Sequence, residues 1–116
     1  MTTKFQAALD SVTRVRGVRG AMLVAGDDGL VVAESLMEGI RGNAVAALAA
    51  SLAKRFRRAS ETAAYGLPQF IHLQASQGLL LAALAPSGML LVVVAEADIN
   101  VGLARLEMLR AGEAVA

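Results

Sequence analysis

The sequence predicts an α/β sandwich of three layers, with a five-stranded antiparallel sheet between helices. Five short apolar or β-branched stretches alternate with three stretches of helical periodicity, in the order helix, two strands, helix, three strands, helix. The strands come in groups joined by turns, which favours antiparallel neighbours over parallel crossovers. Two strands are apolar at every position and therefore need cover on both faces. We expect the middle helix on one face and the two terminal helices on the other.

The first half of the chain is expected to form a helix and a hairpin. The helix spans about residues 3–15 and ends at Gly17. Strands follow at residues 18–25 and 30–35, separated by a turn that contains Asp28 and Gly29. An Asp-Gly pair favours a hairpin because both residue types tolerate positive φ.

The second half is expected to begin with a long helix over residues 44–65, capped by Asn43 and ended by Gly66 and Pro68. Residues 68–76 alternate between an apolar and a mixed face, and the proline at their start favours a sheet edge. Residues 79–85 and 89–95 are the fully apolar strands. A proline, a serine and a glycine interrupt this region, so we interpret it as a buried hairpin rather than a membrane span.

The closing helix has two candidate caps, Asp98 and Asn100, and one apolar stripe at helical spacing. The stripe contains Ile99, Leu103, Leu106 and Leu109. The whole chain, residues 1–116, is expected to be a single domain, because its length suits one core.

The middle helix carries two apolar stripes about a quarter turn apart. The one with large side chains is expected to face the core: Val45, Leu48, Leu52, Phe56, Ala59 and Ala63. The other is nearly all small: Ala46, Ala50, Ala53, Arg57, Ser60 and Ala64. Exposed helix positions usually mix charges, so this small stripe is expected to pack against a second copy. The alternative is that alanine, the best helix former, merely fills a surface.

A homodimer is also favoured by the apolar fraction of 56%, which is high for so small a monomer. The edge strand beside the middle helix offers pairing with its twin through a two-fold axis. The predicted dimer interface is therefore Ala46, Ala50, Ala53, Arg57, Ser60, Phe70, His72 and Gln74.

The sequence offers little that points to catalysis. It has no cysteine, which fits a cytoplasmic location, and its lone histidine, His72, lacks the companions that a metal site or a catalytic triad needs. Phosphate-binding glycine motifs are missing, so we expect no cofactor, no metal and no enzyme activity. A net charge of +1 and 3% aromatic residues do not suggest nucleic-acid binding.

A basic cluster on the middle helix is the remaining candidate for partner binding. It consists of Lys54, Arg55, Arg57 and Arg58. The cluster is either a docking surface for an acidic patch of another protein or a solvated helix face partly balanced by Glu61.

Three segments resemble the Roadblock family of dynein light chains and bacterial GTPase regulators. They are VRGVRGAMLVAGDDGLVVAES, NAVAALAASLAKRFRRASETA and LLLAALAPSGMLLVVVAEADINVGLARLEMLR. Arg16 departs from the family, which often has proline before the glycine. The resemblance implies the same sandwich, a homodimer through the middle helix and third strand, and binding to Ras-like GTPases or to subunits of large assemblies.

Two functions share all of these features. The first is a non-catalytic regulator that binds a small Ras-like GTPase and changes its hydrolysis or localisation. The second is a scaffold that holds a peptide or receptor segment of a larger assembly without affecting nucleotide turnover. A small-ligand sensor is less favoured, because the apolar strands contain no polar constellation.

Overall fold

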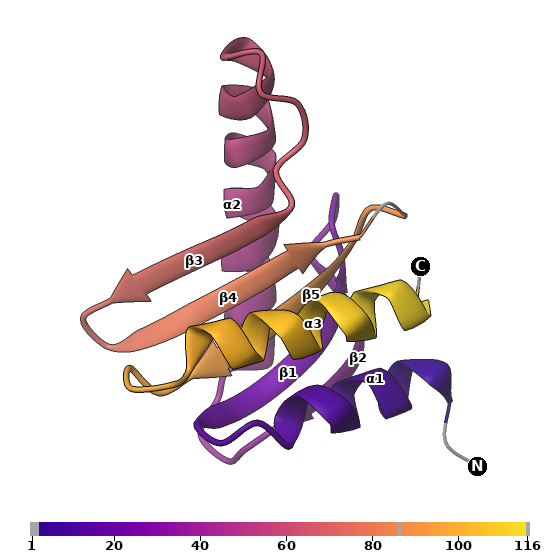
Figure 1. Ribbon diagram of the computed structural model, residues 1–116, viewed down its shortest axis with the longest axis vertical. Coiled ribbons are helices and arrows are strands. Elements are labelled where there is room, and N and C mark those ends of the chain that lie inside the picture. The colour runs from indigo at the N-terminus through magenta and orange to yellow at the C-terminus, as the bar shows by residue number, and fades with distance from the viewer. Residues whose placement is uncertain (1–2, 86, 116) are drawn as a thin grey trace.

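The computed structural model describes residues 3–85 and 87–115, and it confirms the predicted order of elements (Figure 1). The helices and strands are α1 (Lys4–Thr13), β1 (Val18–Ala25), β2 (Leu30–Leu36), α2 (Gly42–Thr62), β3 (Phe70–Ala75), β4 (Gly78–Leu84), β5 (Met89–Ala95) and α3 (Val101–Val115).

The five strands form one antiparallel sheet in the order β2-β1-β5-β4-β3. The central strand β5 places Val92 opposite Met22 of β1 on one side and opposite Ala82 of β4 on the other. The fully apolar stretches are the neighbours β4 and β5, as the hairpin interpretation predicted, although Pro86 lies outside the described residues. The strand after the middle helix, β3, is an edge strand, which confirms the prediction made from its proline.

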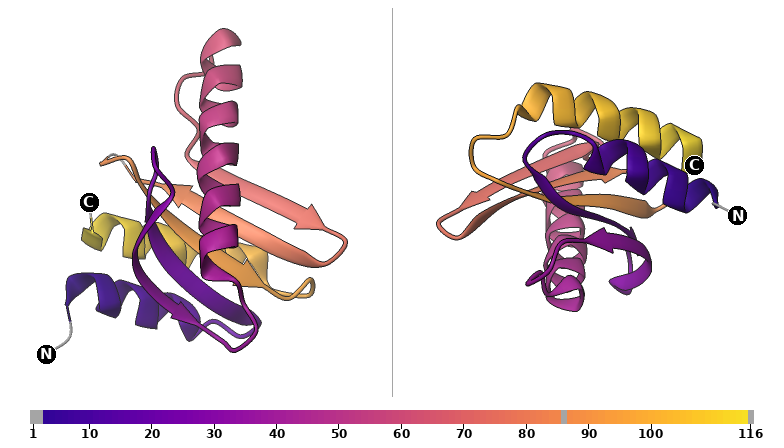
Figure 2. Two further views of the ribbon diagram at one scale, coloured as in Figure 1. Left: turned by 180° about the vertical axis from the view of Figure 1, so that it is seen from behind. Right: turned by 90° about the horizontal axis from the view of Figure 1, so that it is seen from below.

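The sheet is covered on both faces, as predicted. Helices α1 and α3 lie side by side on one face, and α2 crosses the other (Figures 1 and 2). The core beneath α1 and α3 is built around Leu9, Leu81 and Met108, and the core beneath α2 around Met22 and Val92. Within the described ranges, no helix is long and apolar enough to cross a membrane.

The helix ends differ in detail from the prediction. Helix α2 begins at Gly42 rather than Ala44, and its N-cap is Arg41, whose side chain makes no capping hydrogen bond. Asn43 was therefore wrongly assigned as the cap. In α3 the prediction was right for one of its two candidates, because the backbone N–H of Leu103 donates to Oδ1 of Asn100 at 3.0 Å.

Candidate functional site

The small stripe of α2 faces its own sheet, so the predicted orientation of this helix is wrong. Ala46 and Ala53 are completely buried, and Ala50 is nearly so. Ala46 and Ala53 belong, with Ala49, to the core beneath α2, which also contains Met22. These three members of the predicted dimer interface are therefore enclosed within the chain.

The physical reason is the shape of the opposing surface. On this face the sheet presents a dense layer of larger side chains: Met22, Val24, Leu80, Leu90 and Val92. Interiors pack at nearly crystalline density, so a helix can approach such a layer closely only if its own contacting side chains are small. The large side chains of the sheet fill most of this core, and the small alanine side chains allow α2 to pack close to the sheet.

The stripe with large side chains consequently faces mostly outward, although Val45 at its start still packs against the core beneath α2. We call this set the outer stripe: Val45, Leu48, Leu52, Phe56, Ala59 and Ala63. Leu48 is 45% exposed and Phe56 is 44% exposed, while Leu52 and Val45 are half-buried. Ala59 and Ala63 continue the stripe as exposed residues toward the end of the helix. The result is an apolar surface running along α2.

The C-terminal half of α2 also extends beyond the sheet. Figures 1 and 2 show it rising past β3, the edge strand, so that no strand of the same chain lies beneath its end. Two side-chain contacts described here tie this part of α2 to segments outside the helix. Arg57 forms an ion pair with Asp27 of the β1–β2 turn at 3.9 Å, and the Ser60 hydroxyl donates to the carbonyl oxygen of Gly66 at 2.6 Å.

Strand β3 contributes the remaining residues of the predicted interface. His72 and Gln74 are exposed, whereas Phe70 is half-buried with the guanidinium of Arg105 placed 5.3 Å from its ring centre. The strand thus offers an accessible edge with polar side chains on the α3 face and with Ile71 buried under α2.

The basic cluster divides into two parts. Arg57 is one-third exposed and forms an ion pair with Asp27, and this pair links α2 to the β1–β2 turn. Lys54, Arg55 and Arg58 are exposed and, among the described residues, take part in no ion pair. These three side chains are free to meet an acidic surface.

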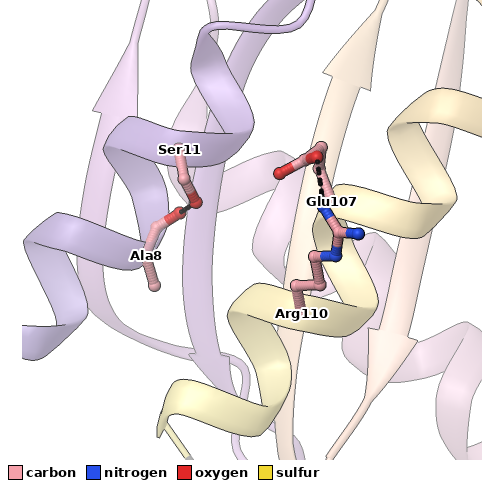
Figure 3. Close-up of polar contacts among 4 residues, drawn as sticks. All are labelled: Ala8, Ser11, Glu107 and Arg110. Atoms are coloured by element: carbon pink, nitrogen blue, oxygen red, sulfur yellow. Dashed lines mark hydrogen bonds and ion pairs between the residues drawn. The ribbon is translucent and has the colours of Figure 1, made fainter.

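The predicted apolar stripe of α3 is likewise turned outward, with only Ile99, just ahead of the helix, buried. Leu103, Leu106 and Leu109 are 45%, 46% and 39% exposed, and the small or flexible residues Ala104, Met108 and Ala111 face the core. On α3, Glu107 and Arg110 form an ion pair at 3.3 Å (Figure 3). On the neighbouring α1, the Ser11 hydroxyl donates to the carbonyl oxygen of Ala8 (Figure 3).

An open groove of about 1080 Å³ lies between the end of α3, the α2–β3 connection and the ends of β4 and β5. The side chains that line this groove are mostly apolar. The charged residues Asp27, Arg57 and Glu113 also line it, and the first two form the ion pair described above. In the part of the chain that the structure describes, no three His, Cys, Asp or Glu side chains gather as metal ligands.

Comparisons with known proteins agree on one family. A model of the Roadblock/LC7 domain matches residues 4–95. An uncharacterized protein of Methanocaldococcus jannaschii, MJ0714, is 36% identical over 105 residues, which cover 90% of this chain and 86% of that protein. The structure of a Roadblock/LC7 domain from Streptomyces avermitilis superposes with a TM-score of 0.85 at 24% identity, covering 99% of this chain and 95% of that one. MglB from Myxococcus xanthus superposes with a TM-score of 0.86 at 19% identity, covering 97% and 92%.

Proposed function

The chain belongs to the Roadblock/LC7 family, and from that premise we propose that it is a non-catalytic, cytoplasmic homodimer that binds a small Ras-like GTPase and regulates its GTP hydrolysis. The observation that carries the proposal is the outer stripe of α2 beside the open edge of β3. A soluble monomer seldom leaves such an apolar surface uncovered, and surfaces of this kind mark protein–protein contacts.

The proposed dimer differs from the interface predicted from the sequence in one respect. Its helix contribution is Leu48, Leu52 and Phe56 rather than the buried alanines. The contribution of β3 is unchanged, because the edge strand and its exposed His72 and Gln74 lie where a two-fold axis would extend the sheet into the second copy.

Partner recognition is assigned to the free cations of α2. Lys54, Arg55 and Arg58 carry three positive charges on the solvent side of the helix, and they suit an acidic patch on the GTPase. Arg57 belongs to the basic cluster but is engaged by Asp27, so we give it a positioning role.

A multiple-turnover hydrolysis assay with the candidate GTPase tests regulation. The proposal expects the purified protein to change the hydrolysis rate and to bind the GTP-loaded and GDP-loaded forms with different affinity. Equal capture of both forms with an unchanged rate would favour the scaffold alternative.

The same assay addresses mechanism. An inserted arginine accelerates GTP hydrolysis by roughly 10³-fold or more in known systems. If the double variant Arg57→Ala with Arg58→Ala binds the GTPase and retains full stimulation, neither arginine is inserted into the nucleotide site. In that case the protein acts by arranging the catalytic groups of the GTPase itself.

A further inference from the structure

Ser60, close to the C-terminal end of α2, follows two arginines in a pattern that no other hydroxyl residue of the sequence shares. The local sequence is Arg-Arg-Ala-Ser at residues 57–60, and two further cations lie just before it. Among the serines and threonines of the sequence, only Ser60 has arginines at both the second and the third position before it. One class of serine protein kinase selects its substrates by cations at these positions, which pair with carboxylates of the kinase. The pattern therefore indicates a candidate modification site.

The Ser60 hydroxyl has a structural role in the unmodified chain. It donates to the carbonyl oxygen of Gly66 at 2.6 Å, in a contact that is exposed to solvent. The backbone N–H of Tyr65 returns to the same residue and donates to the carbonyl oxygen of Ser60 at 2.8 Å. Ala64, within this turn, has a φ of 61°, a left-handed conformation that is unfavourable for a residue with a Cβ. The Ser60 hydroxyl thus holds a strained turn against the end of α2.

The end of α2 is placed where it can open locally. It lies beyond the edge strand β3, and residues 61–67 are all exposed (Figure 1). Helix ends with few buried contacts open at a low cost in free energy, and opening here also releases the strain at Ala64. Kinases bind the residues around a target serine in an extended form, so such fraying is what presents Ser60 to an active site.

A phosphoryl group on Ser60 would act against both side-chain contacts that tie this part of α2 to other segments. The phosphorylated oxygen has no hydrogen to donate to Gly66, and its negative charges are disfavoured at the C-terminal end of a helix. Arg57 lies one helical turn before Ser60, within reach of a phosphate on that residue. The phosphate is a strong acceptor for a guanidinium, whereas the existing pair with Asp27 is 3.9 Å long and partly exposed.

We propose that Ser60 is a phosphorylation site for an arginine-directed serine kinase, and that its modification releases the α2–β3 connection from the helix. The Ser60 hydroxyl oxygen attacks the γ-phosphorus of ATP, and the bond between that phosphorus and the bridging oxygen breaks. ADP leaves, and the hydroxyl proton passes to a base of the kinase. This regulation goes beyond the proposed function and depends neither on the dimer nor on the GTPase.

Phosphorylation of the whole folded chain tests the acceptor. The probe is ATP with the catalytic subunit of a cyclic-AMP-dependent protein kinase, which selects arginines at these two positions. Fragment mass spectra should place one phosphoryl group on Ser60, and Ser60→Ala should abolish its incorporation. Arg57→Ala with Arg58→Ala should slow incorporation roughly tenfold or more, because two charged contacts with the kinase are lost.

Thr62 provides a matched control for the acceptor. Its hydroxyl is also exposed at the end of α2, and it donates to the carbonyl oxygen of Arg58 at 2.8 Å. It lacks arginines at the second and third positions before it. Thr62→Ala should therefore be phosphorylated as fast as the unaltered chain.

Amide hydrogen exchange measures the release of the connection. Exchange at residues 64–67 should be roughly tenfold faster in the phosphorylated chain, because the Ser60 contact and the turn behind it are lost. Ser60→Ala removes the hydrogen bond without adding charge and should give a smaller increase at the same residues. The buried strand β5 should exchange equally slowly in all three proteins.

Two results would overturn the proposal. The first is phosphorylation of a synthetic peptide of residues 54–66 without phosphorylation of the folded chain, which would show that the fold withholds Ser60. The second is a phosphorylated chain whose residues 64–67 exchange as slowly as those of the unmodified chain, which would show that the hydroxyl does not hold the connection. Neither result bears on the hydrolysis assay that tests the proposed function.

Discussion

Replacement of Leu48 by alanine measures directly whether the outer stripe is a contact. Removing three carbon groups from a fully buried site costs about 2.4 kcal/mol at ~0.8 kcal/mol each. Leu48 is 45% exposed in the single chain, so about 1 kcal/mol of that value remains to be gained in an interface. Because the residue occurs twice in a symmetric dimer, the variant should lose about 2 kcal/mol, or ~30-fold in the dimer dissociation constant.

Leu103 provides a matched control for this substitution. It is also a helical leucine and is also 45% exposed, but it lies on α3, on the opposite face of the sheet. Both variants should lower the free energy of unfolding of the single chain by about 1.3 kcal/mol, because just over half of each leucine side chain is already buried within that chain. Sedimentation equilibrium across a dilution series should show weaker dimerisation for Leu48→Ala alone. Wild-type affinity in Leu48→Ala, or an equal loss in both variants, would refute the assignment of this face.

Three further tests, two of them with a comparison variant, probe the packing around the site. Ala53→Leu should overpack the core beneath α2 and lower the free energy of unfolding, measured by urea titration, by about 1–3 kcal/mol. Ala47→Leu, at an exposed position of the same helix, should change the free energy of unfolding little. Gly26→Ala should strongly lower the thermal unfolding temperature, because the new Cβ would lie 2.4 Å from a backbone carbonyl oxygen. Gly112→Ala, whose new Cβ would meet nothing within 4 Å, should stabilise α3 by roughly 0.5–1 kcal/mol. Arg57→Ala removes a surface ion pair at 3.9 Å and should change stability by less than about 1 kcal/mol; a larger loss by calorimetry would mean that the link to Asp27 positions the whole helix end.

Much of the fold could be predicted from local pattern. The Asp-Gly turn, the alternation in residues 70–75 and the two fully apolar strands each express a preference that acts over a few residues. The proline before β3 lacks an amide donor, and that strand is at the edge. Such signals predicted the element order and the layers because they do not depend on what packs against them.

The orientation of two helices could not be predicted in the same way. Periodicity revealed two apolar stripes on α2 but not which one faces inward. Inward packing depends on the combined volume of helix and sheet, and strands filled with leucine, valine and methionine leave room only for alanine on α2. Helix α3 repeats the pattern, with Ala104 and Ala111 inward and Leu106 outward. On α1, by contrast, the large side chains of Leu9 and Val12 are fully buried.

Local sequence pattern indicated some residues of the candidate site but not the contacts that they make. His72 and Gln74 are exposed on the edge strand β3, and their part in a dimer interface stays a prediction. The pairing of Arg57 with Asp27 joins residues 30 positions apart, and no local pattern indicates it.

The molecular mass in solution tests the central claim most directly. For a chain of 12.0 kDa, multi-angle light scattering at micromolar concentration should give twice that mass. A stable, well-behaved species of 12.0 kDa at high concentration would contradict the account, because the outer stripe of α2 would then face water without a partner.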